Sequence, residues 1–466
     1  MAMRWSAAWG MVAGVVCWPA TGMAQMRLSE ALQEAAGHAP MVRVARAEAD
    51  ARQAEARLPL QGILPSARVE AGAVRTTDPI GAFGTLLRQR QVTPAAFDPA
   101  RLNDPAAITN VSGGLVLEIP LINADAWLGR RAASAAADAS RSQTDWTVRS
   151  TQRAVVDAYF GAVLAAARIT ALDAALAAAH AGQKQATSLF GQGMVTKADV
   201  LQAAVRTNEL ESQRADASDG ALTARQQLAL LLGRTHDASR DLDLPVALPD
   251  DATLRALAAA DTGSGIHRDP ARFAQSRADL SALHAGVTAA RADVTRQSSM
   301  LLPRVNGFAR TDWNAPGALF AGRRNWTLGV MASWSLFNSG QSLASIRAAS
   351  ARFTAARNAE QSATQRALAD VDMTRRAVAN ALQRLEHAEV REQLSSEAHR
   401  LVARRYAGGL ATVAELLAAE AMATSSALGH AAARHALIIA VAAHRLATSV
   451  DLTSLSTLDA SRPSDR

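Results

Sequence analysis

Proline is absent from two long stretches of this 466-residue chain, and their position constrains the fold more than any other feature. The stretches run from Pro120 to Pro245 and from Pro316 to Pro463. A proline inside a helix costs about 3 kcal/mol, so long helices are confined to stretches such as these. Both are rich in Ala, Leu, Arg, Gln and Glu, which favour helix. The sequence therefore predicts a proline-containing segment followed by long helices, twice over.

Short segments recur in the same order in the two halves, which indicates an internal repeat. The matching pairs are "GILPSARVEA" (62–71) with "MLLPRVNGFA" (300–309), "GLVLEIPLINADAWLGRRAA" (114–133) with "GVMASWSLFNSGQSLASIRAA" (329–349), and "SLFGQGMVTKADVLQAAV" (188–205) with "RRYAGGLATVAELLAAEA" (404–421). Within each half the expected order is a short helix, two strands and a long helical hairpin. Pro40 and Pro270 each open a further predicted helix, since proline suits the first turn.

The repeat divides the chain into five predicted parts. They are a signal peptide (1–24), a first repeat (25–234), an inter-repeat segment (235–265), a second repeat (266–450) and a C-terminal tail (451–466).

The N-terminus "MAMRWSAAWGMVAGVVCWPATGMAQ" has the layout of a secretory signal. Arg4 precedes an apolar core, and Gly22 and Ala24 are the small residues expected before cleavage. Cys17 is the only cysteine, so the mature chain has no disulfide. Val16 precedes Cys17 where a lipoprotein would carry a small residue, and lipidation is therefore not expected.

The segment "RNWTLGVMASWSLFN" alternates with period two, the signature of a half-buried strand. Trp326 and Trp334 stand at the two ends of its apolar face, roughly 26 Å apart at about 3.3 Å per residue. That spacing suits the aromatic girdles around an outer-membrane barrel, and Trp313 on the preceding strand is assigned to the same girdle. The alternative is a strand in a soluble sandwich. Export and the flanking tryptophans favour the membrane.

Strands and helices both require neighbouring copies of the chain. Four strands cannot close a barrel, and open strand edges are not tolerated in lipid. The first helices of the two hairpins (124–190 and 341–405) would each extend about 100 Å at 1.5 Å per residue. They return through helices at 195–234 and 410–449, and such hairpins need partners along their length.

The two hairpin turns use the same residue types at the same spacing. A glycine supplies positive φ, a threonine caps the returning helix, and an acid three residues later completes a capping box. The turn residues are Gly193, Thr196 and Asp199 in the first half and Gly408, Gly409, Thr412 and Glu415 in the second.

On "GMVTKADVLQA", "GLATVAELLAAEA", "PLIN", "SLFN", "LPS" and "LPR", the chain resembles the TolC-like outer membrane efflux protein family. The likeness covers residues 28–450 in both halves. It implies a mostly helical fold with β structure: a homotrimer in which each chain gives four strands to a twelve-stranded outer-membrane barrel and its hairpins to a periplasmic tunnel. Residues 235–265 and the tail would form a belt around that tunnel. It also implies a passive exit duct, joined through a periplasmic adaptor to an inner-membrane transporter of RND or ABC type.

The resemblance further implies a gate at the hairpin tips, which would also be the adaptor docking site. Glu415 and Asp199 match pore-facing acids, and Tyr406 matches a tyrosine that latches the closed tip. Ala411 and Ala418 stand where some members carry an arginine latch and a second acid, so a weaker gate is expected. The alternative is that both acids only stabilise helix N-termini.

Other functions find less support in the sequence. The ten histidines show no metal-ligand spacing, and no phosphate loop or nucleophile elbow occurs, so no enzyme, metal or cofactor is expected. The net charge of +7 comes from arginines scattered among acids, which does not indicate nucleic acid. A protein-secretion exit channel and a soluble periplasmic coiled-coil adaptor remain alternatives. The loop at 77–108 is expected to be extracellular, and Phe83, Leu86 and Phe97 suggest that it packs on itself or over the barrel mouth.

Overall fold

The computed structural model describes residues 25–235, 237–240, 242–262, 273 and 276–459. The predicted signal peptide with Cys17, and the helix start predicted at Pro270, lie outside these residues. Along the described chain the first half forms α1 (Leu28–His38), α2 (Pro40–Glu55), η1 (Leu58–Gly62), β1 (Ser66–Thr76), α3 (Pro79–Gln89), η2 (Pro94–Phe97), α4 (Pro99–Asn103), β2 (Ile108–Ile122), α5 (Ala124–Gly191) and α6 (Lys197–Leu232). The second half forms η3 (Asp237–Ser239), α7 (Asp251–Thr262), α9 (Ala278–Ser299), β3 (Arg304–Ala315), β4 (Arg324–Ser333), α10 (Gln341–Ala407), α11 (Val413–Thr448) and η4 (Leu452–Asp459).

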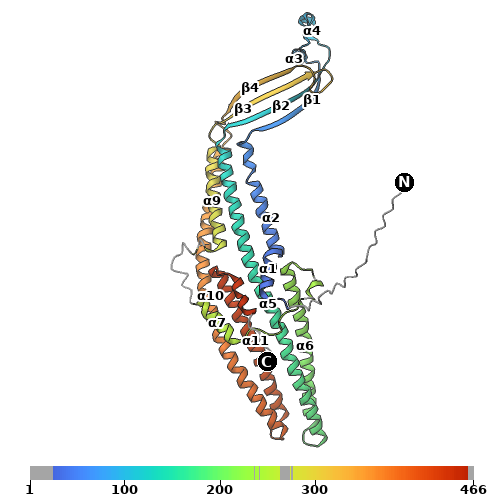
Figure 1. Cartoon of the computed structure of the whole chain (residues 1–466), viewed down its shortest axis with the longest axis vertical. Coiled ribbons are helices and arrows are strands. Elements are labelled where there is room, and N and C mark those ends of the chain that lie inside the picture. Colours follow the sequence, from blue (N-terminus) through green and yellow to red (C-terminus); the bar gives the residue numbers. More distant parts are fainter. Residues whose placement is uncertain (1–24, 236, 241, 263–272, 274–275, 460–466) are drawn as a thin grey trace, which may run out of the picture.

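The molecule is long and narrow, with the sheet at one end and two helix turns at the other (Figure 1). The helices α5 and α10 connect the two ends, and α6 and α11 return about half of that length. The mostly helical, internally duplicated fold predicted from the sequence is therefore confirmed. Proline at the first turn of α2 also matches the prediction for Pro40.

The four strands form one antiparallel sheet in the order β1-β2-β3-β4, with β1 and β4 at open edges. Directly opposed residues on neighbouring strands share a face, so the pairing register shows on which face of the sheet each side chain lies. Five charged residues share one face and form ion pairs there: Arg68, Glu70, Glu118, Arg310 and Asp312. On the opposite face the only charged strand residues are Arg75 and Arg324, both at the outer end of the sheet. The remaining part of that face is uncharged along nineteen positions: Ala67, Val69, Ala71, Ala73, Val111, Gly113, Leu115, Leu117, Ile119, Val305, Gly307, Ala309, Thr311, Trp313, Ala315, Trp326, Leu328, Val330 and Ala332.

Strand β4 is shorter than the sequence pattern predicted. The alternation was expected to continue through Trp334 to Leu336, but the strand ends at Ser333. The reason is its neighbour: β3 begins at Arg304, which pairs with Ser333, so the residues beyond have no strand to bond to. The indole of Trp334 instead donates a hydrogen bond to the carbonyl of Leu301, 2.9 Å away.

The main hydrophobic core lies midway along the helices rather than at either end. It joins residues of α1, α5, α6, α7, α10, α11 and η4, with the Tyr159 hydroxyl donating to the carbonyl of Met26 at 2.9 Å. Away from this core, large apolar side chains on the hairpins are exposed: Leu201, Val205, Leu222, Met373, Val390, Leu394, Leu401 and Met422. The hairpins therefore leave much apolar surface uncovered within one chain.

Two helices, α5 and α11, contain an 18-residue window apolar enough to cross a membrane by length and composition. The sequence showed no uninterrupted apolar run of that length, but these windows allow up to two charged residues. Only 28% and 33% of the two windows is buried within the chain. Such half-exposed, alanine-rich helices also suit packing against other helices.

The long loop between β1 and β2 folds into helices at the outer end of the sheet. Phe83 and Phe97 pack edge to face with ring centroids 5.7 Å apart, so the loop packs on itself, as the sequence suggested. The Gln89 side chain donates to Asn110 at 3.0 Å, and Asn110 donates to Asn314 at 2.8 Å. Both asparagines lie on the charged face of the sheet, so α3 is fastened to that face.

Candidate functional site: the paired helix tips

The first helix tip connects α5 to α6. Gly193 adopts a φ of 73°, a conformation that glycine enters without strain. The amide of Met194 donates to the carbonyl of Leu189 at 2.9 Å, and the amide of Gly193 donates to Phe190 at 2.9 Å. These two bonds satisfy carbonyl groups that the helix end would otherwise leave unpaired.

The second tip, between α10 and α11, repeats this backbone. Gly409 has a φ of 71°, and the Leu410 amide donates to the carbonyl of Arg405 at 2.8 Å. Gly408 has a φ of −90°, which any residue can adopt. Only one glycine of the pair is therefore required by the turn.

Both returning helices begin with a complete capping box. The Thr196 amide donates to the Asp199 carboxylate at 2.8 Å, and the Thr412 amide donates to the Glu415 carboxylate at 2.8 Å. The Thr196 hydroxyl lowers the pKa of Asp199 foremost, and the Thr412 amide lowers the pKa of Glu415 foremost. Glu415 is exposed in the single chain and Asp199 is partly exposed, and both remain ionised near neutral pH.

Tyr406 lies at the contact between the two tips. It is 2% exposed and packs with Val413 and Leu416 of its own hairpin and with Leu189 of the other. Its hydroxyl has no hydrogen-bond partner among the described residues. Burial raises the pKa of this hydroxyl, and the charge of Asp199 raises it further. Tyr406 and Asp199 are distant in the sequence, but the fold brings them close enough for the charge of Asp199 to act on the Tyr406 hydroxyl.

Glu420 is a buried acid near the second tip that sequence reasoning missed. It is 5% exposed, and its Oε1 atom has no hydrogen-bond partner among the described residues. Burial raises the pKa of Glu420, and the charges of Arg206 and His399 partly counteract this. A signal was present in the sequence, because Glu420 follows the buried Val413 and Leu416 at helical spacing, on the same face of α11.

The predicted girdle tryptophans lie at both ends of the sheet. Trp313 and Trp326 lie on the uncharged face toward the outer end, and Trp313 packs against Phe320 with ring centroids 5.7 Å apart. Trp326 is 72% exposed. Trp334 lies one residue beyond β4, at the end of the sheet that joins the helices.

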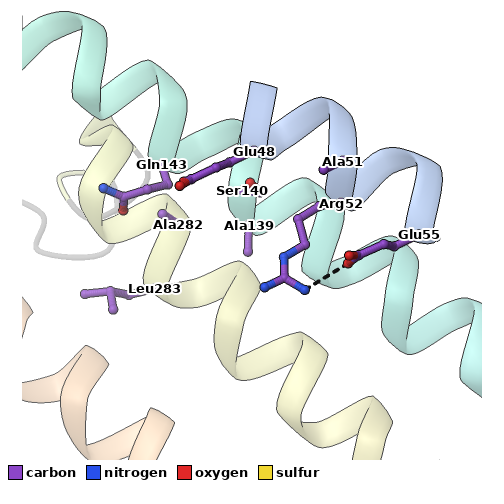
Figure 2. Close-up of a pocket in the computed structure, with 9 residues that line it drawn as sticks. All are labelled: Glu48, Ala51, Arg52, Glu55, Ala139, Ser140, Gln143, Ala282 and Leu283. Atoms are coloured by element: carbon purple, nitrogen blue, oxygen red, sulfur yellow. Dashed lines mark hydrogen bonds and ion pairs between the residues drawn. The ribbon is translucent and has the colours of Figure 1, made fainter. Parts of the chain in front are cut away.

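A surface groove between α2, α5 and α9 is lined by Glu48, Arg52, Glu55 and Gln143 (Figure 2). Arg52 and Glu55 pair with each other at 2.9 Å, and the lining contains no histidine or cysteine. The described residues also include no group of three or more His, Cys, Asp or Glu arranged to hold a metal ion.

Comparison with known proteins gives a consistent result. A family model described as outer membrane efflux protein matches residues 31–234 and 270–449. The fold is similar to that of the outer membrane protein VceC from Vibrio cholerae, with 18% identity, a TM-score of 0.74, and coverage of 90% of this chain and 95% of VceC.

Two further solved structures share the fold. The CmeC outer membrane channel of Campylobacter jejuni has 14% identity and a TM-score of 0.76, covering 93% of this chain and 89% of CmeC. The open state of the MtrE outer membrane channel of Neisseria gonorrhoeae has 18% identity and a TM-score of 0.70, covering 91% of this chain and 88% of MtrE. No match was found among curated protein sequences.

Proposed function

We propose that this chain, which belongs to the outer membrane efflux protein family, forms the outer-membrane duct of a tripartite efflux system. The family places the chain in the outer membrane and among channels rather than enzymes. In the proposed system three copies assemble, and a periplasmic adaptor connects them to an inner-membrane transporter of RND or ABC type. The membership argues against the alternative of a soluble adaptor.

The two-faced sheet is the observation that supports this proposal most strongly. One face carries charge only at its outer end, at Arg75 and Arg324, whereas the other carries Arg68, Arg310 and three acids. An uncharged outer face and a polar interior are the pattern of a barrel in lipid. The sheet has free edges at β1 and β4, and a membrane does not tolerate such edges. Closure by neighbouring copies, giving twelve strands from three chains, satisfies both edges.

The exposed apolar faces of the hairpins support the same assembly in the periplasm. Long helices with uncovered apolar stripes need partners, and a ring of hairpins supplies them. In this arrangement the repeats (25–234 and 266–450) form the wall. Residues 235–265 and 451–466 form the belt.

The helix tips would then be the periplasmic entrance. Glu415 and Asp199 ring the pore with carboxylates, a cation-selective device, and Tyr406 holds the two hairpins together. The adaptor docks on the turns, at Gly193, Thr196, Gly408, Gly409 and Thr412. Trp313, Trp326 and Trp334 lie at the two lipid–water interfaces.

A matched pair of substitutions in β4 tests the barrel. Leu328→Arg puts a charge on the uncharged face, which costs about 2–4 kcal/mol in the middle of a membrane. We expect it to abolish the trimer in detergent-extracted outer membranes and the conductance in planar bilayers. Thr327→Arg, on the charged face, retains both. Equal loss in the two variants, or a wild-type chain found only in the soluble periplasmic fraction, would contradict the proposal.

A further inference from the structure

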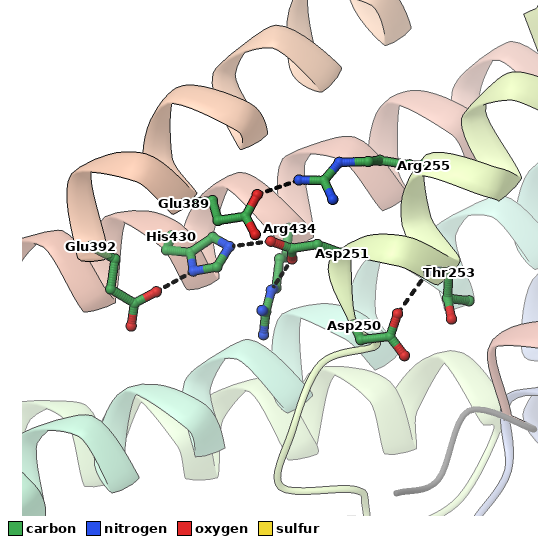
Figure 3. Close-up of polar contacts among 8 residues, drawn as sticks. All are labelled: Asp250, Asp251, Thr253, Arg255, Glu389, Glu392, His430 and Arg434. Atoms are coloured by element: carbon green, nitrogen blue, oxygen red, sulfur yellow. Dashed lines mark hydrogen bonds and ion pairs between the residues drawn. The ribbon is translucent and has the colours of Figure 1, made fainter. Parts of the chain in front are cut away.

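A cluster of charged residues fastens α7 to the second hairpin (Figure 3). The helix α7 belongs to the segment between the repeats, and its first residue, Asp251, points between α10 and α11. His430 of α11 lies at the centre of the cluster and is 6% exposed.

Both ring nitrogens of His430 face a carboxylate. Nε2 lies 2.8 Å from Asp251 of α7, and Nδ1 contacts Glu392 of α10. A neutral imidazole has one donor and one acceptor nitrogen, whereas an ionised carboxylate only accepts. Both contacts are therefore hydrogen bonds only when His430 is an imidazolium. The loss of its proton would turn a lone pair toward one of the carboxylates.

Three further ion pairs connect α7 to the same hairpin. Arg434 donates to Asp251, and Arg255 pairs with Glu389 of α10. Near the other end of α7, Asp261 accepts from Arg445 of α11 at 2.8 Å. Asp251 and Glu392 are thus opposed by Arg434 and His430, and the charges of these four residues balance only when His430 is protonated.

The position of the cluster along the hairpin gives it a mechanical role. His430 lies 18 residues after Thr412, the cap at the tip, which is about 27 Å at 1.5 Å per residue. Among the described residues between the cluster and the tip, the second hairpin contributes a small apolar group around Tyr406, and Leu428 packs against a small cluster of the first hairpin. The contacts of α7 are therefore the last large attachment before the tip.

We propose that α7 is a proton-dependent clamp on the second hairpin, with His430 as its titrating group. With His430 protonated, α7 holds α10 and α11 in the arrangement of this structure. Loss of the proton removes one of the two His430 hydrogen bonds and loosens α7, whose Leu254 and Ala258 stay in the main core, and the tip-side half of the hairpin gains mobility. The further consequence, a wider periplasmic entrance, rests on the proposed function.

The neighbouring groups leave His430 as the titrating one. The charged residues around it are Asp250, directly before α7, Asp251 and Arg255 of α7, Glu389 and Glu392 of α10, and Arg434 of α11. Carboxylates and guanidinium groups do not ordinarily change charge between pH 5 and 8, whereas histidine does. A hydrogen bond from the Thr253 amide also lowers the pKa of Asp250.

A second histidine on α11 serves as a control. His435 is close to Arg153 of α5, and burial, aided by that charge, lowers the pKa of His435. His435 therefore favours its neutral form more than an ordinary histidine does.

Hydrogen–deuterium exchange on the detergent-solubilised full chain tests the clamp. After correction for the intrinsic rate, we expect backbone exchange in α7 and in residues 392–430 to rise about tenfold between pH 6 and pH 8.5. His430→Gln should exchange fast at both pH values, and His430→Arg, which keeps a permanent charge, should exchange slowly at both. His435→Gln should behave as the wild type does.

The outcomes separate the clamp from the channel. Wild-type exchange that does not depend on pH, or a pH dependence that persists in His430→Gln, would overturn the clamp. Exchange does not require a pore, so a chain that forms no channel yet shows these shifts contradicts the proposed function alone. In planar bilayers, conductance that rises with pH in the wild type but not in His430→Arg would support both.

Discussion

The two helix tips have the same backbone conformation but differ in how deeply one aromatic side chain is buried. Gly193 and Gly409 have φ angles within two degrees of each other, and each turn is followed by a complete capping box. The aromatic residue three positions before each glycine differs in its exposure to solvent. Phe190 is 42% exposed, whereas Tyr406 is 2% exposed.

The difference indicates that duplication kept the turn while the side chains took separate roles. Phe190 lies beside Lys197, whose ammonium group is 5.7 Å from the ring centroid, and it remains available to a partner. Tyr406 instead packs against Leu189 of the other hairpin and joins the tips within one chain. The aromatic residue of the second tip therefore packs between the two hairpins, whereas that of the first tip remains exposed.

The largest expected effect comes from removing the buried ring. Tyr406→Ala should weaken packing at the tips by about 3–5 kcal/mol, because a large buried side chain is lost. Phe190→Ala should change stability by less than about 0.5 kcal/mol, as exposed positions do. Hydrogen exchange at residues 402–417 measures the first effect, and equal protection in both variants would remove the distinction between the tips.

The hydroxyl of Tyr406 gives a sharper version of the same comparison. It is buried without a hydrogen-bond partner among the described residues, so Tyr406→Phe should be neutral or stabilising in the same exchange measurement. Marked destabilisation would mean that the hydroxyl has a partner in the assembly that one chain lacks.

Next in size are the turn glycines, for which the two tips should behave alike. Gly193→Ala and Gly409→Ala each place a side chain in the left-handed region, at a cost of about 1–2 kcal/mol. Gly408→Ala, at negative φ, should stabilise by about 0.4–1 kcal/mol. Thermal unfolding measures all three, and a larger cost for Gly408 than for Gly409 would refute the assignment of the turn.

The caps should have similar and smaller effects. Thr196→Ala and Thr412→Ala each remove the hydroxyl that caps a returning helix, which costs about 1 kcal/mol. Thr→Ser variants, which keep the hydroxyl, serve as controls. A cost confined to one tip would indicate that the other cap is satisfied by a different group.

Lowering the pH is expected to have the smallest effect, and the two tips should respond to it differently. The pKa values of Asp199 and Glu415 are lowered in the fold, so their contribution is present at neutral pH and is lost as pH falls below about 4. The pKa of Glu420 is raised, so its protonation adds stability as pH falls. Acid should therefore loosen the first tip more than the second. Exchange profiles from pH 6 to pH 3 measure this, and Glu420→Gln should remove the difference.

The periodic and local features were predictable from the sequence. The proline-free stretches predicted both hairpins, and the glycine and threonine positions predicted both turns and both caps. These features depend on residues within about five positions of one another, so their physics is contained in a short window of sequence. The alternation in β1 and β3 is less regular, and only the register showed that their charged residues share one face, apart from Arg75 at the outer end.

The end of β4 and the packing of the long loop required the fold. Strand β4 stops at Ser333 because β3 begins at Arg304, and no pattern in β4 itself records this. The fastening of α3 depends on Asn314, more than 200 residues away from Gln89.

The sequence by itself determined that this chain is a duplicated pair of long hairpins with a strand pair before each, because helix, strand and turn are local choices. Only the tertiary structure decided which charged groups are buried and what opposes them. Glu420 and His430 read as ordinary polar residues in helices, but α6, α7 and α10 enclose them. Burial changes the free energy of a charge through its distance from water and from opposite charges, and segments far apart in the sequence set those distances.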